Sequence, residues 1–248
     1  EYSFIHFYAP IMHEKIKLGE LPPYEFVPFL AAETDVRTNS INRTLGALDQ
    51  VLKNSLDHRV LLDSIGAFED YICKLAEVVY IDFPGKLKSQ SPDTERDDKL
   101  INLIIDSNDK EEIISKIIEE KLRSLFYGNP IHIFEKDKAK LEINNHFKDN
   151  YCNILVEYAE IVARRNIIVH NSGRVDRKYL REVKGTSLKL GNKVQLDSNY
   201  LRRALGILEG IAAETSDCAV KKLYKDASDG KLKLSLESFR KGVGGGHV

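Results

Sequence analysis

Residues that could do chemistry near neutral pH gather in one short stretch, where Arg165-Asn166 is followed by three residues and then by His170. A histidine can exchange a proton at this pH, an arginine can stabilise the charge of a phosphate, and an amide can orient either of them. The spacing alone is weak evidence, because Arg240 and His247 in the Gly-rich end of the chain also satisfy it. The position of the stretch along its predicted helix gives it more weight.

Residues 151–170 have the apolar spacing of a long helix, which the sequence Asn171-Ser172-Gly173 should end. At about 100° per residue, Arg165 falls inside the apolar arc and Arg164 nearly opposite it. The arc consists of Ile154, Leu155, Tyr158, Ile161, Val162, Ile168 and Val169. Since Glu160 lies one turn before Arg164, we expect Arg164 to form a solvated salt bridge on the helix surface.

Arg165, in contrast, is a charge on a face that should be covered, and a buried charge without a partner costs several kcal/mol. Two interpretations follow. An acid from elsewhere in the chain, such as Asp63 or Glu69, could pair with Arg165 and give it a structural role. Alternatively, the face borders a cleft or a subunit interface that receives an anionic ligand. Asn166 and His170 lie at one edge of the same arc, so the three side chains would then form one site.

A run of positive charge accompanies this stretch. Seven basic residues stand against two acidic ones, Asp176 and Glu182, between positions 164 and 184. The basic residues are Arg164, Arg165, Arg174, Arg177, Lys178, Arg181 and Lys184. Charge runs are usually solvated surfaces. Because this one adjoins the candidate site, the last five residues are predicted to bind RNA phosphates.

The whole chain gives no such field, because its formal net charge is −1 over 248 residues. Its apolar runs are too short to span a membrane, and its start at Glu1 has no initiator Met and no basic-then-apolar signal pattern, as if the first residues were missing. Three scattered cysteines, Cys73, Cys152 and Cys218, argue against a disulfide framework and against a zinc site. We therefore expect a cytoplasmic protein without a cofactor.

Helical patterns dominate the rest of the chain, and the sequence predicts an all-α bundle. Residues 1–39 are expected to form an arm of unknown role, residues 40–225 a helical domain, and residues 226–248 a flexible tail. Within the domain, helical spacing appears in the stretches 40–56, 60–79, 113–125, 131–141, 151–170 and 200–224, and a surface loop is expected at 88–98. Alternation around Gly191-Asn192 predicts a small β-hairpin-like excursion at 188–196.

An Arg-Asn segment that is followed by a histidine at the end of a long helix resembles the signature of HEPN domains (higher eukaryotes and prokaryotes nucleotide-binding). By pattern the resemblance extends over residues 40–224, and it is greatest to the prokaryotic RiboL-PSP-HEPN-like group. The stretches that carry it are 68–75, 119–130, 164–171, 178–180 and 188–191. The toxins of this superfamily that are silenced by nucleotidylation carry a tyrosine two residues after the histidine. Ser172 stands there, so that form of control is not expected.

The resemblance implies a helical bundle that forms a homodimer in which two such motifs face each other. Many such domains are metal-independent endoribonucleases that act as toxins or antiviral-defence effectors, with an antitoxin or sensor protein as partner. Arg165, Asn166 and His170 would then be catalytic, through attack of a ribose 2′-hydroxyl on the phosphate. HEPN-like bundles also serve as non-catalytic dimerisation or nucleotide-sensing modules, and this alternative stays open.

Other arrangements of polar residues are less convincing. Pro92-Asp93 with Glu119-Glu120-Lys121 formally matches a metal-dependent nuclease, but that chemistry needs neighbouring strands, and 119–121 falls within a predicted helix. His132 with Glu135, and His146 with Asp149, could each supply two metal ligands, but neither pair has a clear third. No metal site is therefore expected.

Overall fold

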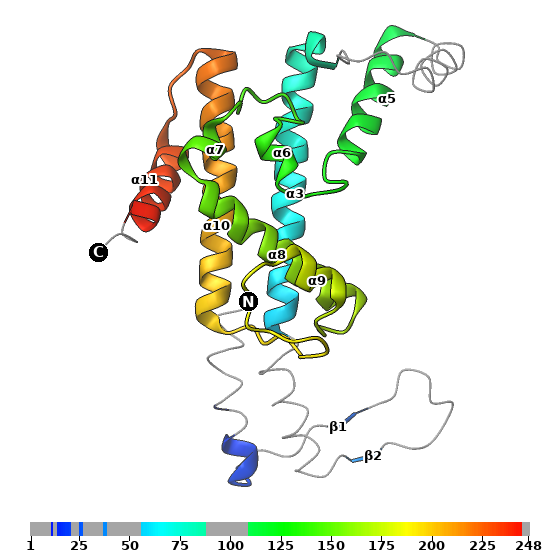
Figure 1. The fold of residues 1–248 in the computed structure, drawn as a ribbon, viewed down its shortest axis with the longest axis vertical. Helices are drawn as coiled ribbons and strands as arrows, with labels where there is room; N and C mark the ends of the chain where they lie inside the picture. Colours follow the sequence, from blue (N-terminus) through cyan, green and yellow to red (C-terminus); the bar gives the residue numbers. More distant parts are fainter. Residues whose placement is uncertain are drawn as a thin grey trace.

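The computed structural model describes residues 11, 14–20, 25–26, 37–38, 56–87 and 109–244. These residues form a bundle of helices (Figure 1), together with one short antiparallel pair of strands, β1 (Glu25–Phe26) and β2 (Arg37–Thr38). The all-α prediction is confirmed. The helix expected at 40–56, the loop expected at 88–98 and most of the arm expected at 1–39 lie outside the described residues, as does the Pro92-Asp93 pair.

Three long helices build the core. Helices α3 (Leu56–Asp82) and α10 (Ser198–Ala219) run side by side along the length of the bundle, and α8 (Cys152–His170) crosses them (Figure 1). One face of α3 is buried at intervals of three and four residues, as the apolar spacing predicted. The buried residues on this face are Leu61, Ile65, Phe68, Ile72, Ala76 and Val79. Asp197 starts α10 by accepting a hydrogen bond from the backbone N–H of Tyr200.

The shorter elements occupy the ends and sides of this core. Helix α5 (Lys110–Arg123) stands beside the end of α3, and α6 (His132–Glu135), α7 (His146–Asn150) and α9 (Arg177–Glu182) are one or two turns long (Figure 1). A 3-10 turn, η2 (Pro84–Leu87), follows α3, and a π-helical turn, η3 (Val220–Tyr224), continues α10. Among the described residues no helix is both long and apolar enough to cross a lipid bilayer.

Helix α8 ends where the sequence predicted. Ser172 and Gly173 have backbone φ angles of 51° and 72°, in the left-handed region that stops a helix, and the N–H of Gly173 donates to the carbonyl of Ile167. The excursion after α9 is extended, but its ends do not pair with each other as a hairpin. Instead, the backbone of Asn192 and Val194 bonds to residues 173–175, with N···O distances of 2.8 and 2.9 Å. The segment therefore fixes the chain just beyond α8.

The tail expected at 226–248 is corrected by the structure up to residue 244. Helix α11 (Gly230–Gly244) lies against α10, with Leu236 and Phe239 buried. Gly-rich composition made the sequence look unstructured, but the ring of Phe239 needs a glycine on the facing helix. A Cβ added to Gly210 would lie 1.9 Å from that ring.

A polar cluster also holds α11 against α10. The carboxylate of Glu214 in α10 is fully buried and accepts two hydrogen bonds from the guanidinium of Arg240, at 2.7 and 2.9 Å. His146 and the hydroxyl of Tyr151 bond to the same carboxylate. Burial alone would raise the pKa of Glu214, but these three partners lower it to about 2, so the group stays charged. The arginine that seemed an accidental match in the sequence is therefore a structural anchor.

Replacing Gly210 with alanine should destabilise the protein, because the new methyl group would displace Phe239 and with it α11. Alanine normally stabilises a helix by about 1 kcal/mol relative to glycine. Gly206 offers a matched control one turn earlier, since nothing lies within 4 Å of a Cβ added there. Thermal unfolding followed by circular dichroism should show a lower Tm for Gly210→Ala and an equal or higher Tm for Gly206→Ala. A rise in both variants would contradict the described packing of α11.

Candidate functional site

The structure gives Arg165 an acid partner within the chain. Its Nη2 atom lies 2.7 Å from the Oε1 atom of Glu69 on α3, and its Nη1 atom donates to the side-chain oxygen of Asn166 at 3.0 Å. Burial raises the pKa of Glu69, while the adjacent guanidinium opposes that rise. Asp63, the other acid considered, lies instead near the exposed Arg59. Arg165 therefore sits in the apolar arc, as predicted, and it is balanced there by one ion pair.

Arg165 remains accessible to solvent despite this pairing. Its side chain keeps 28% of its surface exposed, and the two hydrogen bonds use two of the five N–H groups of a guanidinium. Near the pair is Tyr158, whose buried hydroxyl has no hydrogen-bond partner among the described residues. Burial raises the pKa of Tyr158, so its ring stays neutral. The guanidinium is thus held by Glu69 and Asn166 and retains N–H groups that could donate to an additional anion.

His170 is the last residue of α8, and it is exposed together with its neighbour Val169. The apolar arc that precedes them is covered within the chain, from Ile154 to Val162, by the core that α3 and α10 share. Val169, which the helical phasing placed in the arc, has 52% of its surface exposed. The site residues therefore differ in setting, because Arg165 and Asn166 contact each other in a partly covered position and His170 lies at the open end.

The expectation that Arg164 is a solvated surface residue is wrong. The predicted pair with Glu160 exists, at 2.7 Å, but only 16% of the Arg164 side chain is exposed, and its guanidinium lies 4.1 Å from the centre of the Tyr200 ring. Glu160 also accepts hydrogen bonds from the hydroxyls of Tyr179 and Tyr200. The helical wheel missed this arrangement because it cannot show that α9 and the start of α10 cover the second side of α8.

The second side of α8 carries a small core of its own. Ala163 and Ile167 meet Val175, Tyr179 and Val194, so that α9 and the turn after it are packed onto the last two turns of α8. His58, at the start of α3, lies against Gly173 and Val194, and burial lowers its pKa. This packing holds the basic segment directly beside the end of the helix that carries His170.

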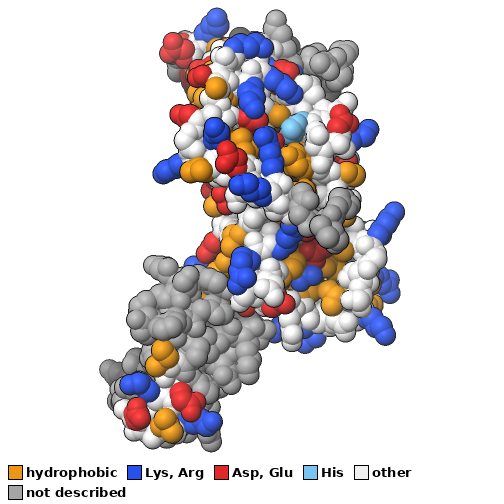
Figure 2. All heavy atoms as spheres, turned by 90° about the vertical axis from the view of Figure 1, so that its left-hand side faces the viewer, with side chains coloured by type: hydrophobic (Ala, Val, Ile, Leu, Met, Phe, Trp, Pro, Cys, Tyr) orange, Lys and Arg blue, Asp and Glu red, His pale blue; other side chains and the backbone are white. Residues whose placement is uncertain are grey.

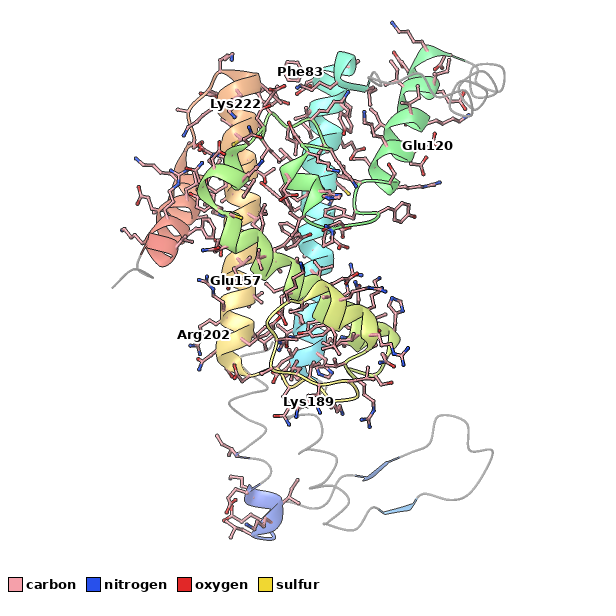
Figure 3. The ribbon with its side chains drawn as sticks, in the orientation of Figure 1. Phe83, Glu120, Glu157, Lys189, Arg202 and Lys222 are labelled. Atoms are coloured by element: carbon pink, nitrogen blue, oxygen red, sulfur yellow. The ribbon has the colours of Figure 1, made fainter. Side chains whose placement is uncertain are left out.

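All five residues predicted to bind RNA are exposed on this segment: Arg174, Arg177, Lys178, Arg181 and Lys184. Two exposed lysines of the turn, Lys189 and Lys193, which the sequence analysis did not include, extend the basic surface. Of the two acids, Asp176 caps α9 through the N–H of Tyr179, and Glu182 lies 3.9 Å from Lys178. Lys189 marks the lower end of the bundle, far from Glu120 on α5 (Figure 3). We call this surface, residues 174–193, the basic end.

The charge is mixed on the face that carries α11, where basic and acidic side chains are interspersed (Figure 2). Within the described part of the chain, no group of three or more His, Cys, Asp or Glu residues is arranged to hold a metal ion. Of the two pairs considered as ligands, His146 is engaged with Glu214.

Comparison of the chain with models of known protein families, with curated proteins and with solved structures finds no match to any of them. The geometry of the site must therefore be interpreted from its own residues.

Removing Arg164 should destabilise the fold, because Glu160 would lose the cation that pairs with it and the Tyr200 ring would lose the guanidinium that lies over it. We expect Arg164→Ala to lower the free energy of unfolding by on the order of 2 kcal/mol. Arg177→Ala, at an exposed position on α9, should change it by less than about 0.5 kcal/mol. Urea denaturation of both variants provides the measurement, and equal stability of the two proteins would refute the buried role of Arg164.

Proposed function

We propose that the chain is a metal-independent endoribonuclease of the HEPN type, with Arg165, Asn166 and His170 as its catalytic residues. The observation that carries the proposal is the placement of an exposed histidine at the end of α8, between a partly open arginine on the same helix and the basic end. RNA would be held at the basic end through its phosphates, in the cytoplasm of a prokaryotic cell. A toxin or an antiviral-defence effector would have such an activity.

In the proposed reaction, the ribose 2′-oxygen attacks the adjacent phosphorus atom, and the bond from phosphorus to the 5′-oxygen breaks. His170 takes the proton of the 2′-hydroxyl, and water returns a proton to the departing 5′-oxygen. The products are a 2′,3′-cyclic phosphate and a free 5′-hydroxyl. Arg165 would stabilise the negative charge on the phosphorus oxygens with the donors that Glu69 and Asn166 leave unused.

A homodimer belongs to this proposal, but not through the whole apolar arc of α8. That arc is covered within one chain by α3 and α10, so it offers no surface to a second copy. The exposed end of the helix, with Val169 and His170, remains for such a contact. Two copies that meet there would bring two His170 side chains close together and form a composite site.

The alternative is a non-catalytic dimerisation or nucleotide-sensing module. The Glu69–Arg165 ion pair favours it, because an arginine that is satisfied within its own chain already has a structural role. A sensor would bind a nucleotide at the end of α8 without cleaving RNA.

Incubation of total RNA in EDTA separates these functions. We expect the wild type to cleave RNA and His170→Ala to be slower by about 10²–10⁴-fold, since a positioned acid–base group is lost. His132→Ala, which removes a histidine on α6, serves as the matched control and should retain full activity. Cleavage that needs Mg²⁺, or that is unchanged in His170→Ala, would contradict the proposal. No cleavage at all, with nucleotide binding that depends on His170, would favour the sensor.

A second comparison separates catalysis from stability at Arg165. Arg165→Ala leaves a half-buried carboxylate without its cation, so a loss of activity could reflect unfolding. In the double variant Arg165→Ala/Glu69→Gln an uncharged amide replaces that carboxylate, so the stability of the fold should recover. The double variant should fold, as judged by circular dichroism, and still fail to cleave RNA. Recovery of cleavage together with stability would show that Arg165 is purely structural.

A further inference from the structure

Helix α5 has an apolar stripe that the rest of the described chain covers poorly. Asp109 caps the helix, and isoleucines recur along one side of it. Only Ile118 is buried, whereas Ile113, Ile114, Ile117 and Leu122 are partly exposed. In Figure 1, α5 stands beside the end of α3 but is tilted away from it. The described residues therefore leave part of the apolar side of α5 without a neighbouring element.

The uncovered surface is a groove between α3 and α5 with a volume of about 550 Å³. Its apolar lining comes from both helices and includes Ile81, Ile114 and Ile118. Ile81 has 59% of its surface exposed, so part of the apolar lining of the groove is accessible to solvent. As far as the described residues define it, the groove is therefore open to solvent and has apolar side chains in its lining.

All the charged residues that line this groove are acidic. They are Glu77 on α3 and Glu111 and Glu119 on α5, and all three are exposed. Of the basic residues of α5, Arg123 pairs with Glu119 and so offsets one of these three acids, whereas Lys121 donates to the backbone carbonyls of Lys86 and Leu87. An apolar base with carboxylates along its edges is complementary to a helix that has leucine-like side chains on one face and lysines or arginines beside them.

We propose that the groove between α3 and α5 is a docking site for a basic amphipathic helix of a partner protein. RNA is not the occupant, because phosphates would be repelled by the carboxylates of Glu77 and Glu111. The groove also lies far from the basic end. Helix α3 connects the two regions, and its 27 residues correspond to a length of about 40 Å. The molecule would thus bind RNA at one end and a protein at the other.

The docking can be tested with a fluorescein-labelled designed helix of roughly 18 residues, with leucine on one face and lysine beside it. Fluorescence anisotropy with the full chain gives the Kd. Glu77→Lys/Glu111→Lys should weaken binding by about tenfold or more, because it reverses two charges of the groove. Glu135→Lys/Glu237→Lys makes the same change in net charge at exposed positions on α6 and α11, and it should have a small effect.

A pair of apolar variants tests the apolar lining of the groove. Ile81 and Val156 are both 59% exposed, and only Ile81 lines the groove. Ile81→Ser should weaken binding and Val156→Ser should not, and neither substitution at such an exposed position should unfold the chain. Equal effects of the groove and control variants, or no binding, would overturn the proposal.

Two further outcomes would also overturn it. Binding that appears only after Leu100, Leu103 and Ile104 are replaced by serine would mean that residues 88–108 of the chain itself occupy the groove. Self-association that Ile81→Ser abolishes would identify a second copy as the occupant. Because the readout is peptide binding, a failure here is distinct from a failure of RNA cleavage, which the His170 variants report.

Discussion

Burial of helix α8 on two sides is the constraint on which the site depends. One side faces the core shared by α3 and α10, and the other carries α9 and the turn that follows it. Two adjacent arginines near the end of such a helix cannot both reach solvent, so each needs an acid. Glu160, one turn back, pairs with Arg164, and Glu69, on α3, pairs with Arg165. What remains exposed at the end of the helix is His170, directly before the basic end.

This arrangement explains why local sequence patterns predicted some features and missed others. The apolar periodicity of α3, α8 and α10 reflects burial along a single helix face, so the all-α fold and the end of α8 were predictable. The same periodicity placed Arg165 on a covered face that would need an acid partner, and Glu69, one of the two acids named as examples, is the partner observed. Arg164 was misjudged, because the Tyr179 and Tyr200 side chains that cover it come from elements a helical wheel does not include. Helix α11 was missed for a similar reason, since its glycines suggested a loop while its packing depends on Gly210 of another helix.

Although the net charge of the chain is only −1, its basic and acidic side chains are concentrated in different regions. At the basic end, exposed lysines and arginines lie next to the small core on the second side of α8. The two acids of this segment are engaged, Asp176 as a helix cap and Glu182 in a pair with Lys178. At the opposite end of α3, glutamates border an apolar groove. A local field of each sign can attract a different macromolecule, even though the whole chain has almost none.

The central claim is that His170 and Arg165 promote attack on an RNA phosphate by the neighbouring ribose 2′-hydroxyl, so that the nucleophile belongs to the RNA itself. The most direct test uses an RNA oligonucleotide that the wild-type protein cleaves at one position in EDTA, with and without a 2′-deoxyribose at that position. The account predicts that the substituted strand binds with similar affinity and is not cut, and that the unmodified strand ends in a 2′,3′-cyclic phosphate or its hydrolysis product. Cleavage of the deoxy-substituted strand at the same position would contradict the account.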